Sequence, residues 1–280
     1  MWTQENRGRY DRRGQRFPSD LTDAEWALIE PLIAPAKRGG NKRTVDLRAV
    51  VDGLLYVLST GCQWRALPTD LPPRATVHGY LDRWDYDGTL ARIHHTLFMA
   101  CREQAGRAAS PTAAILDSQS VKGAEKGGRR STRRATMPGK TIRGKKRHIL
   151  VDTQGLVMHA LVHPASVQDR TGGVWVMATL FGLYPFLLRL YADGGYQGPA
   201  FKAGLRRVCR RLKLTIVKRS KKAQGFVVLP KRWIVERTFA WLNRCRRLAK
   251  DWECRSRTAR AFLLLASIRL MTRKLCQTTI

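Results

Sequence analysis

The sequence predicts a mixed α/β sheet with helices on its faces, preceded by an all-helical unit. Up to residue 104, apolar residues recur in steps of three and four, the period of amphipathic helices. From residue 112 on, short apolar runs alternate with helical patterns, which is typical of a sheet flanked by helices. We therefore expect a basic flexible arm at 1–16, a helical domain at 17–104, a small-residue linker at 105–111 and an α/β domain at 112–280.

The charge of the chain indicates a polyanionic partner. The formal net charge is +31 and the pI is near 11.1. Lysine and arginine side chains bind phosphate groups favourably because they release condensed counterions. Hydrophobic residues make up 44% of the chain, which is enough for folded cores, so a disordered basic tail is excluded.

Other classes of protein fit the composition poorly. The longest apolar run, 261–268, is too short to span a bilayer, and residues 1–17 have no apolar core of a signal peptide. We therefore expect a cytoplasmic protein with no membrane partner. The six cysteines form no C-x-x-C pair, so we expect reduced thiols rather than disulfides or a zinc site.

Helix signals divide the first domain. Residues 22–25 (TDAE) form a capping box that opens the first helix. Thr44 is the expected N-cap of a second helix, which Gly61 ends. Two further helices are expected at 75–84 and 89–104.

The helix at 75–84 is the candidate for reading a DNA groove. A compact helical unit in a basic protein favours a helix-turn-helix-like DNA-binding domain. Four side chains are predicted to point outward from this helix: Thr76, His78, Tyr80 and Arg83. Of these, Thr76, His78 and Arg83 are predicted to contact DNA. The alternative is a helical dimerisation or packing module. His78 has no metal-ligand spacing with other residues and is treated as an ordinary helix residue in that respect.

In the second domain, a strand is expected at 112–120, ending on Asp117. Residues 121–146 are rich in glycine, arginine and lysine and predict a mobile loop that faces phosphates. The runs 148–152 and 156–163 predict a β-hairpin. The remaining elements are expected in the order helix 169–181, strand 187–193, helix 199–212, strand 214–217, a helix after Pro230 and a helix at 258–276.

The helix after Pro230 carries a single acid in a basic setting. Between Lys231 and Lys250 there are seven cationic side chains and one carboxylate, Glu236. Taken alone, this favours a solvated basic helix in which Glu236 pairs with Arg232 four residues before it. A carboxylate presented into a phosphate-rich groove is the other interpretation, and it requires partner acids elsewhere.

Two candidates for such partners are Asp117 and Asp193, which end two hydrophobic strands. Sites in α/β sheets are built at strand ends, and converging carboxylates repel one another unless a cation lies between them. Oxygen ligands suit Mg²⁺ or Mn²⁺, and two such ions would promote an in-line phosphoryl transfer. A strand-end cap or an ion pair is the alternative role for each aspartate.

Other acids have local explanations. Asp152 begins a hairpin turn, and Asp169 is expected to cap the helix that follows it. Glu125 and Glu253 are not assigned to metal.

The chain closely resembles the IS5-family insertion-sequence transposases of the DDE class, which have an RNase H-like catalytic domain. The resemblance covers about residues 18–255. It is carried by motifs at 19–26 (SDLTDAEW), 37–40 (KRGG), 60–65 (TGCQWR), 115–122 (ILDSQSVK), 144–152 (GKKRHILVD), 163–170 (HPASVQDR), 192–196 (ADGGY) and 232–242 (RWIVERTFAWL).

The resemblance implies that Asp117, Asp193 and Glu236 are the catalytic, metal-binding acids. Arg232 matches the arginine of the Tyr-Arg-Glu-Lys signature of the family. The tyrosine and lysine positions hold Leu229 and Asn243, with Arg244 beside the latter, and the loop 129–138 lacks an expected Gly-Tyr-Asp-like run.

The implied function is DNA transposition, with binding of terminal inverted repeats, metal-dependent cleavage and transfer of the 3′ end to target DNA. The implied partners are double-stranded DNA and a second copy of the chain in a synaptic complex, and the implied location is the bacterial nucleoid. A nuclease without strand transfer and a catalytically dead DNA-binding relic are the alternatives. The residues expected to contact DNA are Arg232, Arg237, Arg244, Lys122, Lys146, Thr76, His78 and Arg83.

Overall fold

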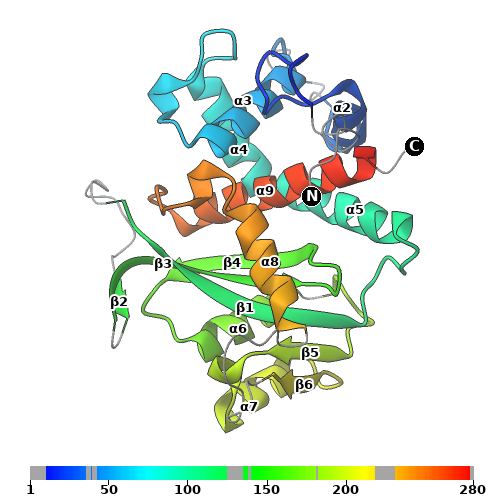
Figure 1. Ribbon diagram of the computed structural model, residues 1–280, viewed down its shortest axis with the longest axis vertical. Helices are drawn as coiled ribbons and strands as arrows, with labels where there is room; N and C mark the ends of the chain where they lie inside the picture. Colours follow the sequence, from blue (N-terminus) through cyan, green and yellow to red (C-terminus); the bar gives the residue numbers. More distant parts are fainter. Residues whose placement is uncertain are drawn as a thin grey trace.

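The computed structural model describes residues 11–35, 39, 43–124, 135–137, 140–180, 182–217 and 231–277. A group of helices forms one end of the molecule and a mixed sheet forms the other, with α5 and α9 running between them (Figure 1). The basic arm at 1–16 and the loop at 37–43 lie mostly outside the described residues, as do Leu229 and Pro230.

The helical part follows the predicted pattern. Its elements are α2 (Asp23–Ile29), η1 (Glu30–Leu32), α3 (Leu47–Thr60), η2 (Trp64–Ala66), α4 (Arg74–Tyr86) and α5 (Thr89–Gln104). The capping box of Thr22 and Glu25 is present, and Gly61 ends α3 with a φ of 68°. The expected cap at Thr44 is wrong, because Asp46 is the N-cap and its carboxylate accepts the N–H of Arg48 at 2.8 Å.

Within the described residues the sheet has six strands, in the order β2-β3-β1-β5-β6, and β4 also pairs with β3. The pairs β1–β3 and β3–β4 are antiparallel, whereas β1–β5 and β5–β6 are parallel. The strands are β1 (Ala113–Lys122), β2 (Ala135–Met137), β3 (Lys140–Val151), β4 (Val157–Pro164), β5 (Arg189–Ala192) and β6 (Lys213–Ile216). The helical elements of this part are α6 (Asp169–Ala178), η3 (Gly194–Tyr196), α7 (Pro199–Val208), α8 (Arg232–Leu242), η4 (Arg246–Leu248) and α9 (Ser256–Gln277).

The segment predicted as a loop at 121–146 is largely strand where the structure describes it. β1 continues past Asp117 to Lys122, and β3 begins at Lys140 and pairs with it. Gly144 faces Lys122 across this ladder, and a Cβ atom there would lie 2.0 Å from the carbonyl oxygen of Val121. The backbone pairing holds these basic residues in a strand although they lack an apolar pattern. Residues 125–134 and 138–139 lie outside the described part of the chain.

Helices cover both faces of the sheet. Successive β1 residues point to opposite faces, so Gln119 reaches Asn243 at the end of α8, whereas Ser118 reaches Asp169 at the start of α6. Figure 1 shows α8 crossing the strands at β1.

The C-terminal helix α9 joins the two ends of the molecule. It packs against α5 and β4 and also reaches α2, α3 and α4 (Figure 1). Arg257 and Arg260 pair with Asp85 of α4 at 3.1 Å each, and His94 of α5 hydrogen-bonds to Ser267 at 3.0 Å. The buried apolar residues therefore form one continuous cluster. The division of the chain at 105–111 stays a prediction.

Candidate active site

Asp117 and Asp193 lie side by side on neighbouring strands. The parallel register pairs Leu116 with Ala192, and the two aspartates are the next residues along the chain after this pair. Asp193 follows the last residue of β5, as predicted. Asp117 lies within β1 rather than at its end, because β1 runs on past β5 and pairs with β3.

Backbone N–H groups orient both carboxylates. Oδ1 of Asp117 accepts the N–H of Ser118 at 2.7 Å, and Oδ1 of Asp193 accepts the N–H of Gly195 at 2.9 Å. Burial raises the pKa of Asp117 to about 6. The negative charges of Asp193 and Glu236 act in the same direction, whereas the Ser118 hydrogen bond and the charge of Arg232 lower the pKa. The site therefore concentrates negative charge, which a cation would relieve.

Glu236 lies close enough for its charge to act on Asp117, but it pairs with a cation of its own helix. Its Oε1 lies 3.3 Å from Nη2 of Arg232, one helical turn earlier, and its side chain is 56% exposed. This is the pairing expected from the helix alone. Within the described residues, no group of three or more His, Cys, Asp or Glu side chains lies close enough to hold a metal ion. The structure thus brings two acids together and leaves the third turned toward Arg232.

Asp169 is a further acid at the site, which the sequence did not indicate. It is the first residue of α6 rather than its cap, since the N-cap is Gln168 and makes no side-chain hydrogen bond. Its Oδ1 accepts hydrogen bonds from Nζ of Lys146 at 2.9 Å and from Oγ of Ser118 at 2.8 Å. The prediction that Lys146 contacts DNA is therefore wrong, because its side chain is only 2% exposed and forms an ion pair with Asp169. Residues on both faces of β3 are buried here, so the position of Lys146 depends on the pairing of this strand and on its partner Asp169.

Comparison with known families agrees with this geometry. The profile of the family described as "Transposase DDE domain" matches residues 108–271. The chain belongs to this family. Domains of this family act on DNA and generally use divalent metal ions.

Further matches indicate an insertion-sequence transposase. Residues 21–94 match the family described as "Putative transposase of IS4/5 family". A Burkholderia cepacia protein described as "Putative transposase for insertion sequence element IS402" is 35% identical over 147 residues, which is 49% of this chain and 68% of that protein. A 16.2 kDa protein of the same element is 32% identical over 108 residues, covering 36% of this chain and 72% of that protein. No solved structure matches.

In the α/β part of the transposase, the residues predicted to contact DNA lie in different environments. Arg244 and Lys122 are exposed. Arg237 is only half-buried, but its guanidinium stacks 4.5 Å from the rings of both Trp233 and Trp241 and donates to the carbonyl of Gln154 at 2.9 Å. Arg237 is thus already engaged within the molecule, whereas Arg244 and Lys122 are accessible to a phosphate.

The outward face of α4 differs from the prediction. Tyr80 is buried, at 9% exposure, and His78 packs on the Trp64 ring with its Nδ1 3.6 Å from Asp82. Arg83 is exposed, and Thr76 is half-buried in the wall of a cavity of about 800 Å³. The side of α4 that bears Asp82 and Asp85 is bound to α9, so Arg83 and Thr76 lie in the accessible part of this helix.

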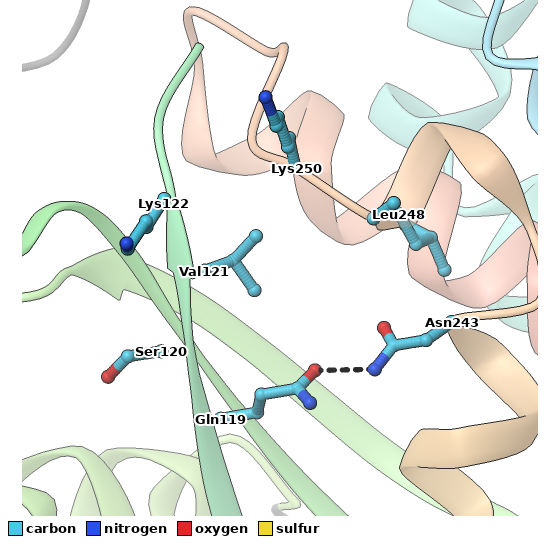
Figure 2. A pocket seen from close by; sticks show the side chains of 8 residues that line it. Gln119, Ser120, Val121, Lys122, Asn243, Leu248 and Lys250 are labelled. Atoms are coloured by element: carbon cyan, nitrogen blue, oxygen red, sulfur yellow. Dashed lines mark hydrogen bonds between the residues drawn. The ribbon is translucent and has the colours of Figure 1, made fainter.

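A smaller cleft of about 270 Å³ lies between β1 and the segment that follows α8 (Figure 2). Nδ2 of Asn243 donates to Oε1 of Gln119 at 3.1 Å across it. Lys122 and Lys250 also line the cleft. The signature position that holds Asn243 therefore faces the strand that bears Asp117.

The two remaining acids considered, Asp152 and Glu253, have local structural roles. Oδ1 of Asp152 accepts the N–H groups of Gln154 and Leu156 at 2.9 Å each, which confirms its role in the hairpin turn. Its other oxygen pairs with Arg102 in the interior. Glu253 pairs with Arg247 at 2.6 Å.

No helix of the described residues is long and apolar enough to cross a membrane.

Proposed function

We propose that this transposase cleaves DNA at the ends of its insertion sequence and transfers the freed 3′ ends to target DNA, with Asp117, Asp193 and Glu236 as its metal-binding acids. The observation that carries the proposal is that Asp117 and Asp193 directly follow paired residues of the adjacent parallel strands β1 and β5, with Glu236 close enough to raise the pKa of Asp117. The presence of all three acids argues against a catalytically dead relic.

The residues fit divalent ions such as Mg²⁺ or Mn²⁺, because they supply carboxylate oxygens at a site of accumulated negative charge. Two bound ions would lower the pKa of an attacking water or 3′-hydroxyl and stabilise the leaving oxygen. Glu236 must turn away from Arg232 to join the other acids. An exposed ion pair of this kind contributes only about 0–1 kcal/mol, so the change costs little. Arg232 would then be free to bind a DNA phosphate.

The architecture supports the rest of the proposal. We assign the α/β part to the RNase H-like class, because its mixed sheet has antiparallel strands on one side of β1, parallel strands on the other and helices on both faces. The N-terminal helices would bind the terminal inverted repeats in a helix-turn-helix-like manner through the exposed part of α4, including Arg83. Holding two ends for transfer would require at least a homodimer.

The test is a cleavage and strand-transfer assay on a DNA fragment that carries the element's own ends, with and without Mg²⁺. We expect Asp193→Asn to abolish cleavage and to leave binding of the ends within about twofold, because the carboxylate acts on the metal rather than on the fold. Asp70→Asn, at an exposed acid of the helical part, serves as the control and should cleave normally.

Two outcomes would change the proposal. If Asp193→Asn still cleaves DNA, Asp193 is not one of the metal-binding acids. Cleaved ends that never appear joined to target DNA, even with the wild-type chain, would favour the nuclease without strand transfer.

A further inference from the structure

A buried positive charge lies behind the proposed catalytic acids. The ammonium group of Lys146, 2% exposed, donates to Oδ1 of Asp169 at 2.9 Å and to the carbonyl of Val167 at 3.0 Å. A charge in the interior is costly unless it is paired and hydrogen-bonded. Burial raises the pKa of Asp169, but the hydrogen bonds from Lys146 and Ser118 outweigh this effect and lower it. Asp169 is therefore held as a carboxylate.

Asp169 lies close to the environment of both Asp117 and Asp193. Through Oδ1 it accepts the hydroxyl of Ser118, whose N–H in turn donates to Asp117. On the other side, a Cβ atom at Gly195 would lie 3.6 Å from Oδ2 of Asp169 and 3.0 Å from Oδ1 of Asp193. The absence of a side chain at Gly195 thus leaves open the space between the carboxylates of Asp169 and Asp193.

A buried hydroxyl without a partner lies in the same place. Tyr196 is 1% exposed, and its phenolic oxygen has no hydrogen-bond partner among the described residues. Burial raises the pKa of Tyr196 well above its ordinary value. The nearby Ser118 side chain opposes this effect, and the charges of Asp117, Asp169 and Asp193 add to it. The phenol therefore lies within electrostatic reach of all three aspartates. A buried hydroxyl left without a partner points to a water or another ligand that it would bind.

We propose that Asp169, anchored by Lys146 and Ser118, is a positioning residue of the metal site, and that Oδ2 of Asp169 and the Tyr196 hydroxyl hold water that completes the coordination provided by Asp117 and Asp193. This inference rests on the proposed function. Asp169 acts through water rather than as a direct ligand, because Lys146 already neutralises its charge and its Oδ1 already accepts hydrogen bonds from Lys146 and Ser118. Outer partners of this kind typically change metal affinity by about 10- to 100-fold when they are removed.

The chain offers a matched control for a purely structural role of this ion pair. Lys145, the preceding residue of β3, is 4% exposed and pairs with Asp251 at 3.3 Å on the opposite face of the sheet. Asp251→Asn therefore breaks a buried lysine–aspartate pair of the same kind away from the acids. A change in Mn²⁺ affinity or melting temperature that both variants show therefore comes from the loss of a buried ion pair and not from the metal site.

The experiment measures Mn²⁺ binding to the full-length protein by isothermal titration calorimetry, together with the melting temperature. We expect Asp169→Asn to weaken Mn²⁺ binding by about 10-fold or more and Asp251→Asn by less than about twofold. Mn²⁺ affinity of Asp169→Asn equal to that of the wild type would overturn the inference. Asp193→Asn distinguishes the two proposals: if it too binds Mn²⁺ normally, the assignment of the metal site itself fails.

Tyr196→Phe keeps the inference testable if Asp169→Asn does not fold. The substitution removes a hydroxyl that makes no hydrogen bond to the described residues, so the melting temperature should be unchanged or higher. We expect Mn²⁺ affinity to fall nonetheless, by about threefold or more, since one water would lose a partner. Unchanged affinity in this variant would contradict the role given to Tyr196.

Discussion

Replacing Asp117 with asparagine should stabilise the metal-free transposase at neutral pH while abolishing cleavage. The pKa of Asp117 is raised from an ordinary value of 3.8 to about 6, chiefly by burial. At about 1.4 kcal/mol for each tenfold change in proton affinity, this difference corresponds to an upper limit of about 3 kcal/mol. Asparagine carries no charge and its amide oxygen can still accept the N–H of Ser118.

The sign of this change in stability, and its dependence on pH, follow from proton linkage. Between pH 3.8 and about 6 the unfolded chain loses the proton of Asp117 and the folded chain keeps it, so this group's contribution to folding falls as the pH rises. Above pH 6 the contribution is fully lost in the wild type. Asp117→Asn avoids the loss, so its advantage should be largest at pH 8 and about half as large at pH 5. For a chain of this size, about 3 kcal/mol corresponds to roughly 6–12 °C in melting temperature.

The assay is thermal unfolding of both proteins in EDTA at pH 5 and pH 8, with Asp70→Asn as the control for losing an exposed acid. Adding Mg²⁺ at pH 8 should raise the melting temperature of the wild type more than that of Asp117→Asn, because bound cation relieves the same repulsion. The reasoning is refuted if Asp117→Asn is no more stable than the wild type at pH 8, or if its advantage is the same at both pH values.

Two further predictions concern stability and DNA binding. Arg102→Met should lower the free energy of unfolding by about 3–5 kcal/mol in urea denaturation, because it leaves the fully buried Asp152 carboxylate without its cation. The double variant with Asp152→Asn should recover part of this loss, and a loss below about 1 kcal/mol would contradict the reasoning. Binding of the ends should weaken by about a thousandfold between roughly 50 and 200 mM salt, given a net charge of +31, and equal affinities at both salt concentrations in a filter-binding assay would be the contrary result.

The sequence by itself determined the features that depend on neighbouring residues. The capping box at Thr22, the end of α3 at Gly61 and the hairpin turn at Asp152 are local hydrogen-bond or backbone requirements, and each is present. The position of Asp193 was also predictable, since a short apolar run followed by Asp-Gly-Gly indicates a strand and its end. The matching family profile agrees with the family resemblance that the motifs of the chain indicate.

Tertiary structure alone decided how distant segments meet. β1 passes Asp117 because β3 pairs with it, and this pairing turns Lys146 from an expected DNA contact into the buried partner of Asp169. In the same way, only the folded chain shows that α9 contacts both the helices of the first part and the sheet. Charge patterns favour an exposed position for a lysine among basic residues, but a lysine at an inward position of a paired strand is buried if a carboxylate from another element can neutralise it. That carboxylate comes from α6, and only the folded chain brings it there.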